Sequence, residues 1–193
     1  MEHNIPINKK IFSLSELNDL GFSAYMVRKM VAHGFLEKLN KWTYENKQFE
    51  GGDSDYIYAY AYVPDGIICL SSAAVYYGLT TYRPDVVNVA VARKRNVTTL
   101  PEWPTIALWY FDESRLKTGI SEMEACGQMI KIYDVEKTVV DFVSYRNRVG
   151  IEETKEILVN YLKKENRDIN KLCRYAEKLR CRETMETYLE VLV

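Results

Sequence analysis

The segment from residue 11 to residue 45 constrains the fold most, because glycines divide it into pieces too short to fold alone. Its first piece predicts a short helix that ends before Gly21 and begins at Ser13 or Ser15, either of which can act as an N-cap. The spacing of three leucines places them on one face of this helix: Leu14, Leu17 and Leu20. A short helix with one apolar face must pack against another element to be stable.

A second helix is expected directly after this break, from Ala24 to His33, with Ser23 as its N-cap and Gly34 as its stop. Four residues follow the spacing of a buried helical face: Ala24, Val27, Met30 and Val31. The opposite face then presents Tyr25, Arg28, Lys29 and Ala32, with His33 near its end. The sequence therefore predicts a second helix with a cationic outer face.

A hairpin is predicted after the second helix, with strands at 36–39 and 42–44 around the turn Asn40-Lys41. Two helices joined by a tight turn and followed by a hairpin are the layout of a winged helix-turn-helix. In such a domain the second helix can enter the major groove of DNA, and the hairpin tip can reach the sugar-phosphate backbone.

The remainder of the chain predicts a larger domain of mixed structure. The polar stretch from Gln48 to Ser54 is the best candidate for a linker, so we expect a DNA-binding domain at residues 1–50 and a second domain at 55–193. Tyrosines alternate with apolar residues from Tyr56 to Tyr62, a pattern that fits a strand, although its alanines favour a helix. Strands are expected at 66–70, 86–92, 105–111 and 128–133, and a helix capped by Ser71 is expected to end at Gly78.

From Asp134 onward the pattern is helical. Asp134 and Asp168 are candidate N-caps, and further helices are expected from Ile151 and from Glu183 to Leu192. The apolar positions of the helix from Ile151 are Ile151, Ile157, Leu158, Tyr161 and Leu162. The predicted fold class is α+β, with an N-terminal winged helix-turn-helix and a mixed α/β C-terminal domain that ends in a helical block.

The charge of the chain is unevenly distributed along it. The formal net charge is −1, but residues 1–47 hold 7 Lys/Arg against 5 Asp/Glu and residues 144–182 hold 11 against 6. Residues 48–143 are acidic, with 8 Lys/Arg against 13 Asp/Glu. Two basic regions around an acidic one are compatible with a protein that binds a polyanion.

Composition argues against several other classes of protein. The four cysteines form no CxxC pair and are expected to be reduced thiols in a cytoplasmic protein. No stretch is apolar enough to span a membrane, and no secretory leader is recognisable. The glycines form no nucleotide-binding or hydrolase motif, and the two histidines, His3 and His33, lie far apart in sequence. We therefore expect no catalytic residues, no metal site and no cofactor.

Three blocks of this sequence resemble the AbiEi-type antitoxins of bacterial type IV toxin–antitoxin and phage-defence (abortive infection) systems. The blocks run from Ser15 to Tyr44, from Pro64 to Thr80, and from Asp134 to Phe142 with the following Arg146 to Gly150. The chain departs from the family pattern at Trp42, where a glycine is usual in the hairpin, and at Ser72, where a histidine is common. From the first block to the last, the resemblance spans Ser15 to Gly150, which is most of the chain.

The resemblance implies a bacterial DNA-binding antitoxin that represses its own operon. It also implies a neighbouring gene for a nucleotidyltransferase-like toxin, which the antitoxin counteracts without a stable complex. The partners expected on this basis are an inverted-repeat DNA operator and that toxin.

The residues expected to contact DNA are Ser23, Tyr25, Arg28, Lys29, Lys38 and Lys41. Arg28 is the best candidate for a bidentate contact to guanine, and Lys38 and Lys41 for phosphate contacts from the hairpin. Ser23 and the free N–H groups of its helix could hold a phosphate, and Lys9 and Lys10 could reach the DNA backbone from an N-terminal arm. The alternative is that these charges only keep a helix face in water.

A possible second basic surface comprises Arg146, Arg148, Lys163, Lys164, Arg167, Lys171 and Arg174. It predicts either a second contact to nucleic acid or a surface needed for antitoxin activity. The alternative is a solvated helical face with partners three or four residues away, such as Glu177 beside Arg174.

Two other functions stay open on the sequence alone. Asp134, Glu136 and Lys137 resemble the acidic-plus-lysine cluster of a metal-dependent nuclease, although Asp134 and Glu136 also suit a helix start. The chain could instead be an interaction module that inhibits a partner enzyme directly.

Overall fold

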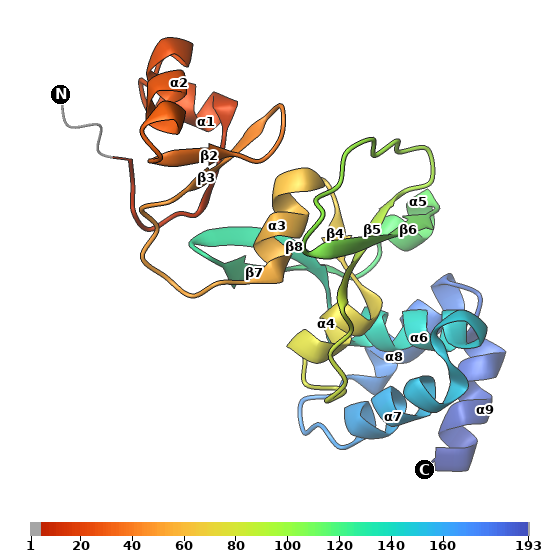
Figure 1. Ribbon diagram of the computed structural model, residues 1–193. Helices are drawn as coiled ribbons and strands as arrows, with labels where there is room; N and C mark the ends of the chain where they lie inside the picture. Colours follow the sequence, from red (N-terminus) through yellow and green to blue (C-terminus); the bar gives the residue numbers. More distant parts are fainter. Residues whose placement is uncertain (1–4, 193) are drawn as a thin grey trace. The chain divides into compact units, whose positions relative to one another are not determined.

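The computed structural model describes residues 5–192, which fall into two compact units (Figure 1). Unit 1 comprises Met1–Gly66, Val97–Thr105 and Met123–Ile130, and unit 2 comprises Ile67–Asn96, Ile106–Glu122 and Lys131–Val193. The domain boundaries expected at 1–50 and 55–193 stay a prediction. His3 lies outside the described residues.

Unit 1 begins with the element order β1, α1, α2, β2, β3. The strands are β1 (Ile11–Ser13), β2 (Leu36–Lys38) and β3 (Thr43–Asn46), and they form an antiparallel sheet in the order β1-β3-β2. Tyr44 of the central strand pairs with Phe12 on one side and with Lys38 on the other. The sequence missed β1, because three residues are too few to show an alternating pattern.

The helix α1 (Leu14–Asp19) has Ser13 as its N-cap. Ser13 Oγ accepts from the N–H of Glu16, whose carboxylate accepts in return from the N–H of Ser13, so two N–H groups of the helix start are satisfied. Leu17 is fully buried, whereas Leu20 is 47% exposed. The helix was expected to run through Leu20 but ends at Asp19, with Leu20 as its C-cap.

The helix α2 (Ala24–Ala32) has Ser23 as its N-cap and His33 as its C-cap. Val27 and Met30 are buried, as expected, and Val31 is partly buried. Ala24 is exposed, against expectation, because it is the first residue of the helix. The small core beneath both helices consists of Ile5, Phe12, Leu17, Phe22, Val27, Met30, Leu36 and Tyr44.

Unit 1 also includes α3 (Asp55–Tyr62), which confirms the helix expected for the tyrosine-rich stretch. The helix buries Ile57, Ala59 and Ala61 and leaves its tyrosines partly exposed. The polar stretch before α3 forms no helix or strand.

The second sheet has the strand order β6-β5-β4-β8-β7. Its strands are β4 (Ile67–Ile68), β5 (Val86–Ala92), β6 (Thr105–Phe111), β7 (Ile120–Ala125) and β8 (Gln128–Tyr133). β4 pairs antiparallel with β5 and parallel with β8. The bounds of β5, β6 and β8 are those that the sequence predicts. The sequence missed β7, because two glutamates interrupt its apolar residues and leave no continuous apolar run.

Two short helices of unit 2 differ from expectation. α4 (Leu70–Tyr76) begins directly after β4 with Cys69 at its N-cap position, so the prediction of Ser71 as the cap was wrong. Ser71 instead donates a hydrogen bond to the carboxylate of Glu153. α5 (Glu113–Lys117) was missed because five residues are too short for helical periodicity.

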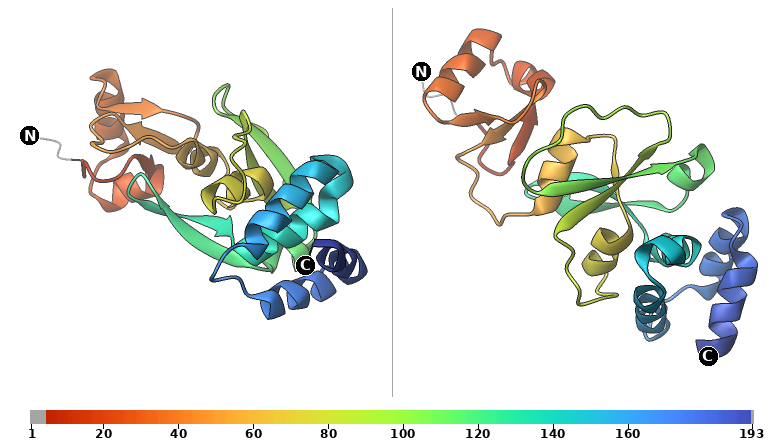
Figure 2. Two further views of the ribbon diagram at one scale, coloured as in Figure 1. Left: turned by 90° about the horizontal axis from the view of Figure 1, so that it is seen from below. Right: turned by 45° about the vertical axis from the view of Figure 1, so that its right-hand side comes forward.

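The chain ends in four helices: α6 (Val135–Val149), α7 (Ile151–Leu162), α8 (Ile169–Lys178) and α9 (Arg182–Leu192). Figure 2 shows them from two further sides. Asp134 and Asp168 cap α6 and α8 through their side chains, as predicted. Ile157, Leu158 and Tyr161 of α7 are buried, but Ile151 is 48% exposed because it begins the helix. The chain is α+β, with a C-terminal helical block.

Among residues 5–192, no helix has both the length and the apolar character that crossing a membrane requires.

Candidate nucleic-acid interface

The outer face of α2 is open to solvent within unit 1. Ser23, Tyr25, Arg28 and Lys29 are all exposed, and Tyr25 keeps 61% of its surface accessible. Ser23 Oγ accepts from the N–H of Met26 at 3.4 Å, so the cap that starts the helix lies on the same surface. No acidic residue occurs between Ser23 and His33.

The cations on this face have no carboxylate partner in the described part of the chain. Arg28 Nε donates to the carbonyl of Ala24 at 3.2 Å, a contact within its own helix. Lys29 Nζ lies 5.1 Å from the centre of the Tyr25 ring, a cation–π contact at an exposed site. His33 ends the helix with Nδ1 2.7 Å from the carbonyl of Lys29. These charges are therefore available to an external anion.

Three other lysines of unit 1 differ, because carboxylates already hold them. Lys9 pairs with Glu16, and Lys47 lies 2.8 Å from Glu37 and 3.2 Å from Glu45. Lys10 is buried and lies 2.7 Å from Asp53 and 3.5 Å from Glu45. Lys9 and Lys10 thus hold unit 1 together, which contradicts the expectation that they extend from a free arm.

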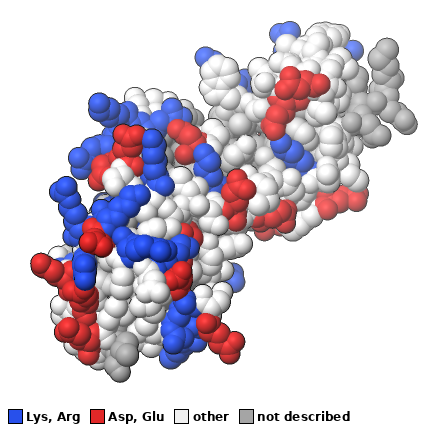
Figure 3. Space-filling view, turned by 180° about the vertical axis from the view of Figure 1, so that it is seen from behind, with Lys and Arg blue, Asp and Glu red and all other residues white. Residues whose placement is uncertain are grey.

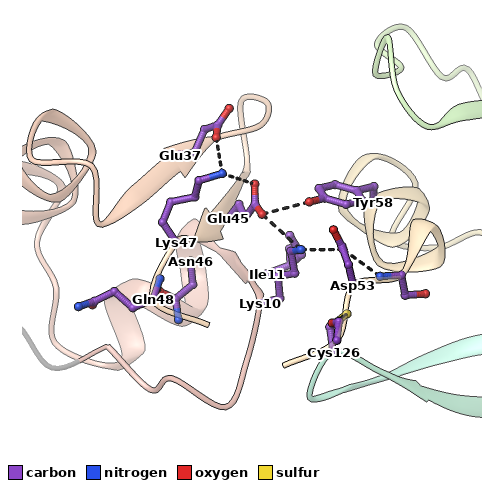
Figure 4. A network of polar contacts seen from close by, with 12 residues as sticks. Lys10, Ile11, Glu37, Glu45, Asn46, Lys47, Gln48, Asp53, Tyr58 and Cys126 are labelled. Carbon is purple, nitrogen blue, oxygen red and sulfur yellow. Dashed lines mark hydrogen bonds and ion pairs between the residues drawn. The ribbon is translucent and has the colours of Figure 1, made fainter. Parts of the chain in front are cut away.

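Figure 4 shows the network around Lys10. Burial acts to lower the pKa of Lys10, but hydrogen bonds to Asp53 and Tyr58 outweigh burial and hold that pKa above its usual value. The backbone N–H of Lys10 donates to the carbonyl of Cys126 at 3.2 Å, and that of Ile11 donates to Gln128 Oε1 at 3.1 Å. These bonds fasten the start of β1 to the turn between β7 and β8, whose residues belong to the same unit.

The turn between β2 and β3 carries Lys41 and Trp42 at its tip. Asn40 Oδ1 accepts from the N–H groups of Trp42 and Thr43 at 2.8 and 3.1 Å, which fixes the turn, and Asn40 Nδ2 donates to the carbonyl of Ala61 at 2.9 Å. Lys41 Nζ lies 4.7 Å from the centre of the Trp42 ring. Lys38 and Lys41 are exposed and have no carboxylate partner within residues 5–192.

Two exposed aromatic residues of unit 1, Phe35 and Trp42, were not among the predicted site residues. Trp42 is 62% exposed and Phe35 is 41% exposed, and the Phe35 ring stacks with His33 at 6.4 Å. The position of Trp42 directly after the turn dipeptide Asn40-Lys41 was a usable signal, because a side chain at a hairpin tip has no core to enter.

The second basic set lies on the helical block of unit 2. Arg148, Lys163, Arg167 and Arg174 are exposed, and none has a carboxylate partner in the portion that the structure describes. Figure 3 shows one face of the molecule, on which Lys and Arg side chains gather over this unit with fewer acidic ones between them. The guanidinium carbon Cζ of Arg148 lies 3.9 Å from the centre of the Trp109 ring.

The remaining members of the set are less accessible. Lys171 is held between Asp134 and Glu136 at 3.1 and 2.9 Å. Arg146 and Lys164 are partly buried, and Arg146 donates to the carbonyl of Val143. Lys171 therefore belongs to the internal structure of the helical block rather than to a free surface.

Of the three residues that resemble a nuclease cluster, Lys137 does not join the other two. Asp134 and Glu136 both bind Lys171, and Tyr161 donates to Glu136. Lys137 is fully buried, pairs with Asp141 and lies 3.9 Å from the centre of the Tyr133 ring. Over the described residues, no three His, Cys, Asp or Glu side chains are grouped to hold a metal ion.

Comparison with known proteins adds no relative. No protein-family model matches the chain, and a search of curated proteins finds no significant match.

Proposed function

We propose that this chain is a DNA-binding transcriptional repressor and an antitoxin of the type IV class, as its resemblance to the AbiEi-type antitoxins implies. The observation that carries the DNA-binding part is the contrast between paired and unpaired cations within unit 1. Lys9, Lys10 and Lys47 are neutralised by carboxylates, whereas Arg28 and Lys29 on α2 face solvent without one. Exposed and unpaired cations on one helix face favour binding to phosphate and base edges.

The proposal treats α1, α2 and the β2–β3 hairpin as a winged helix-turn-helix. The turn between the helices contains Gly21 at φ 87°, a conformation that suits glycine, and it separates two helices of six and nine residues. In this arrangement α2 enters the major groove, with Arg28 as the candidate for a bidentate guanine contact. Lys38 and Lys41 contact phosphates from the hairpin.

The operator is an inverted repeat beside the promoter of the chain's own operon. Two copies of the chain occupy its two half-sites. The antitoxin part of the proposal requires a neighbouring gene for a nucleotidyltransferase-like toxin, which the chain counteracts in the bacterial cytoplasm without a stable complex.

A gel-shift titration tests the DNA-binding part. The probe is the DNA directly upstream of the chain's own coding sequence, and the competitor is the same fragment with its sequence shuffled. We expect tighter binding to the native fragment, and log K falling with log salt by about 0.9 per phosphate contacted. Equal affinity for both fragments at every salt concentration would remove the repressor proposal.

The antitoxin part has its own test. Inducible expression of the neighbouring toxin gene is expected to stop growth, and co-expression of this chain is expected to restore it. A charge-removing double variant, R28A/K29A, separates the two activities if repression is lost and rescue remains. Absence of rescue by the wild-type chain would contradict the antitoxin assignment without affecting the DNA-binding result.

A further inference from the structure

Unit 2 contains a cavity of about 310 Å³ between α5 and the end of α8. Its lining residues are Asp112, Ser114, Arg115, Lys178, Leu179 and Arg180. This volume lies at the lower end of the range for small-molecule sites, roughly 300–1,000 Å³. Three of the six residues are cationic and one is acidic, so the lining has an excess of positive charge.

Arg115 provides a rigid cation in this cavity. Its guanidinium donates to Asp141 at 2.6 Å, to Ser144 at 3.4 Å and to the carbonyl of Leu179 at 3.3 Å. The group also lies 5.0 Å from the centre of the Tyr145 ring. These contacts use both N–H groups of Nη2 and one of Nη1, so the Nε–H and one Nη1–H remain, on different edges of the guanidinium.

Lys178 and Arg180 supply two further cations to the lining of the cavity. Both are exposed, and neither has an ion-pair partner in the described chain. Arg180 has φ 58°, a left-handed conformation, and its N–H donates to the carbonyl of Glu177 at 3.1 Å. The backbone turn that ends α8 thus fixes the position from which the Arg180 side chain extends.

Among the described residues, no carboxylate pairs with Lys178 or Arg180, whereas Arg115 is paired with Asp141. Asp141 is fully buried and is already bound to Lys137 and Arg115. Asp112 accepts from the backbone N–H of Arg115 at 2.9 Å, and this hydrogen bond holds the pKa of Asp112 below its usual value. Asp112 is the one acidic residue of the lining, against three cations.

We propose that this cavity binds the phosphate group of a small ligand, with Arg115 as the fixed donor and Lys178 and Arg180 closing over the anion. One remaining N–H of the Arg115 guanidinium can donate to a phosphate oxygen, and the exposed cations Lys178 and Arg180 add charge without directional demands. Two sources carry this chemistry: free inorganic phosphate, or a phosphate ester such as a nucleoside monophosphate. The site does not depend on the DNA-binding proposal, because every residue of it belongs to unit 2.

Calorimetric titration of the full chain tests the site. Inorganic phosphate and adenosine monophosphate are each titrated at constant ionic strength with chloride as the competing anion. The double variant K178Q/R180Q removes both rim cations, whereas K163Q/R167Q removes two exposed cations outside the cavity lining. Because both variants lose the same charge, a general electrostatic effect would weaken binding equally in both.

We expect saturable binding by the wild type, a loss of at least about tenfold in K178Q/R180Q, and a change of less than about twofold in K163Q/R167Q. Tighter binding of the monophosphate than of phosphate identifies an ester as the ligand class, and equal binding identifies free phosphate. No saturable binding of either probe, or equal losses in both variants, overturns the proposal.

A variant that removes a negative charge from the lining, rather than positive ones, tests the charge argument. Asp112→Asn removes the one carboxylate of the lining, and an asparagine retains the ability to cap α5. We expect tighter phosphate binding by about two- to fivefold, since a like charge near the anion is lost. Weaker binding by Asp112→Asn, with the helical signal unchanged in circular dichroism, would count against the site.

Discussion

The ammonium group of Lys137 pairs with the carboxylate of Asp141 one turn further along α6, and neither side chain is exposed to solvent. Asp141 also binds Arg115 at 2.6 Å, so one carboxylate serves two cations in the core of unit 2. Burial lowers the pKa of Lys137, and the charge of Asp141 opposes that effect. Loss of the Asp141 carboxylate would therefore leave both Lys137 and Arg115 without their counter-charge.

Replacing Asp141 is expected to destabilise the protein more than replacing Lys137. Asp141→Asn leaves two cations near each other without a counter-charge, which costs about 3–5 kcal/mol when a buried pair is broken. Lys137→Met leaves the pair of Asp141 and Arg115 intact and fills similar volume, so we expect a smaller loss, under about 2 kcal/mol. Urea unfolding of both variants measures the difference, and equal losses would contradict the asymmetry.

Gly127 should not tolerate a side chain. A Cβ atom there would lie 1.8 Å from the carbonyl oxygen of Asn8, and φ is 78°. We expect Gly127→Ala to reduce the free energy of unfolding by at least about 2 kcal/mol. Gly52→Ala is the matched control in unit 1, because nothing lies within 4 Å of its Cβ position. A thermal melt that ranks the two variants in the reverse order would refute this account of the turn.

Acid should weaken the link between Lys10 and Asp53. The hydrogen bond from Lys10 lowers the pKa of Asp53, so the unfolded state binds a proton at a higher pH than the folded state does. The contribution of this ion pair to the free energy of unfolding is complete above the unfolded-state pKa of Asp53, about 4. It is lost as the pH falls through the lower folded-state pKa.

Because the Asp53 side chain is 70% exposed, the contribution is less than about 1 kcal/mol. Asp53→Asn is expected to flatten the fall in stability between pH 5 and pH 3, the window set by that lowered pKa. Urea unfolding at each pH measures this. If the free energy of unfolding falls with pH in parallel for the variant and the wild type, the contact does not contribute to stability.

Arg28→Ala is expected to relax sequence preference. If Arg28 makes a bidentate guanine contact, its loss lowers discrimination at one base pair by about 1–3 kcal/mol. Competition gel shifts with single-base operator variants measure that discrimination. A variant that keeps the full preference of the wild type would place Arg28 outside the base-reading surface.

Lys41→Ala is expected to weaken binding to every DNA alike. A phosphate contact carries no sequence information, so native and shuffled fragments should lose the same factor, and the salt slope should decrease by about 0.9. Lys47→Ala is the control, because Lys47 lies in the same unit but is held by Glu37 and Glu45. An unchanged slope for Lys41→Ala would mean that the hairpin tip does not contact DNA.

Much of the fold could be predicted from local sequence. Ser23, Asp134 and Asp168 cap the expected helices, and β5, β6 and β8 have the expected bounds, because caps and apolar runs depend on neighbouring residues. The strands and helices that escaped prediction, β1, β7 and α5, are short or have polar alternate positions. Their formation depends on pairing with residues far away in the chain, which periodicity does not reveal.

Local sequence was enough to predict which residues carry charge on the outer face of α2, because helical spacing alone places Arg28 and Lys29 opposite Val27 and Met30. It did not determine which cations are free. Lys9, Lys10 and Lys171 looked as available as Arg28, but folding brings a carboxylate from another element beside each of them. Tertiary structure decided this, since an ion pair depends on distance in space rather than on separation along the chain.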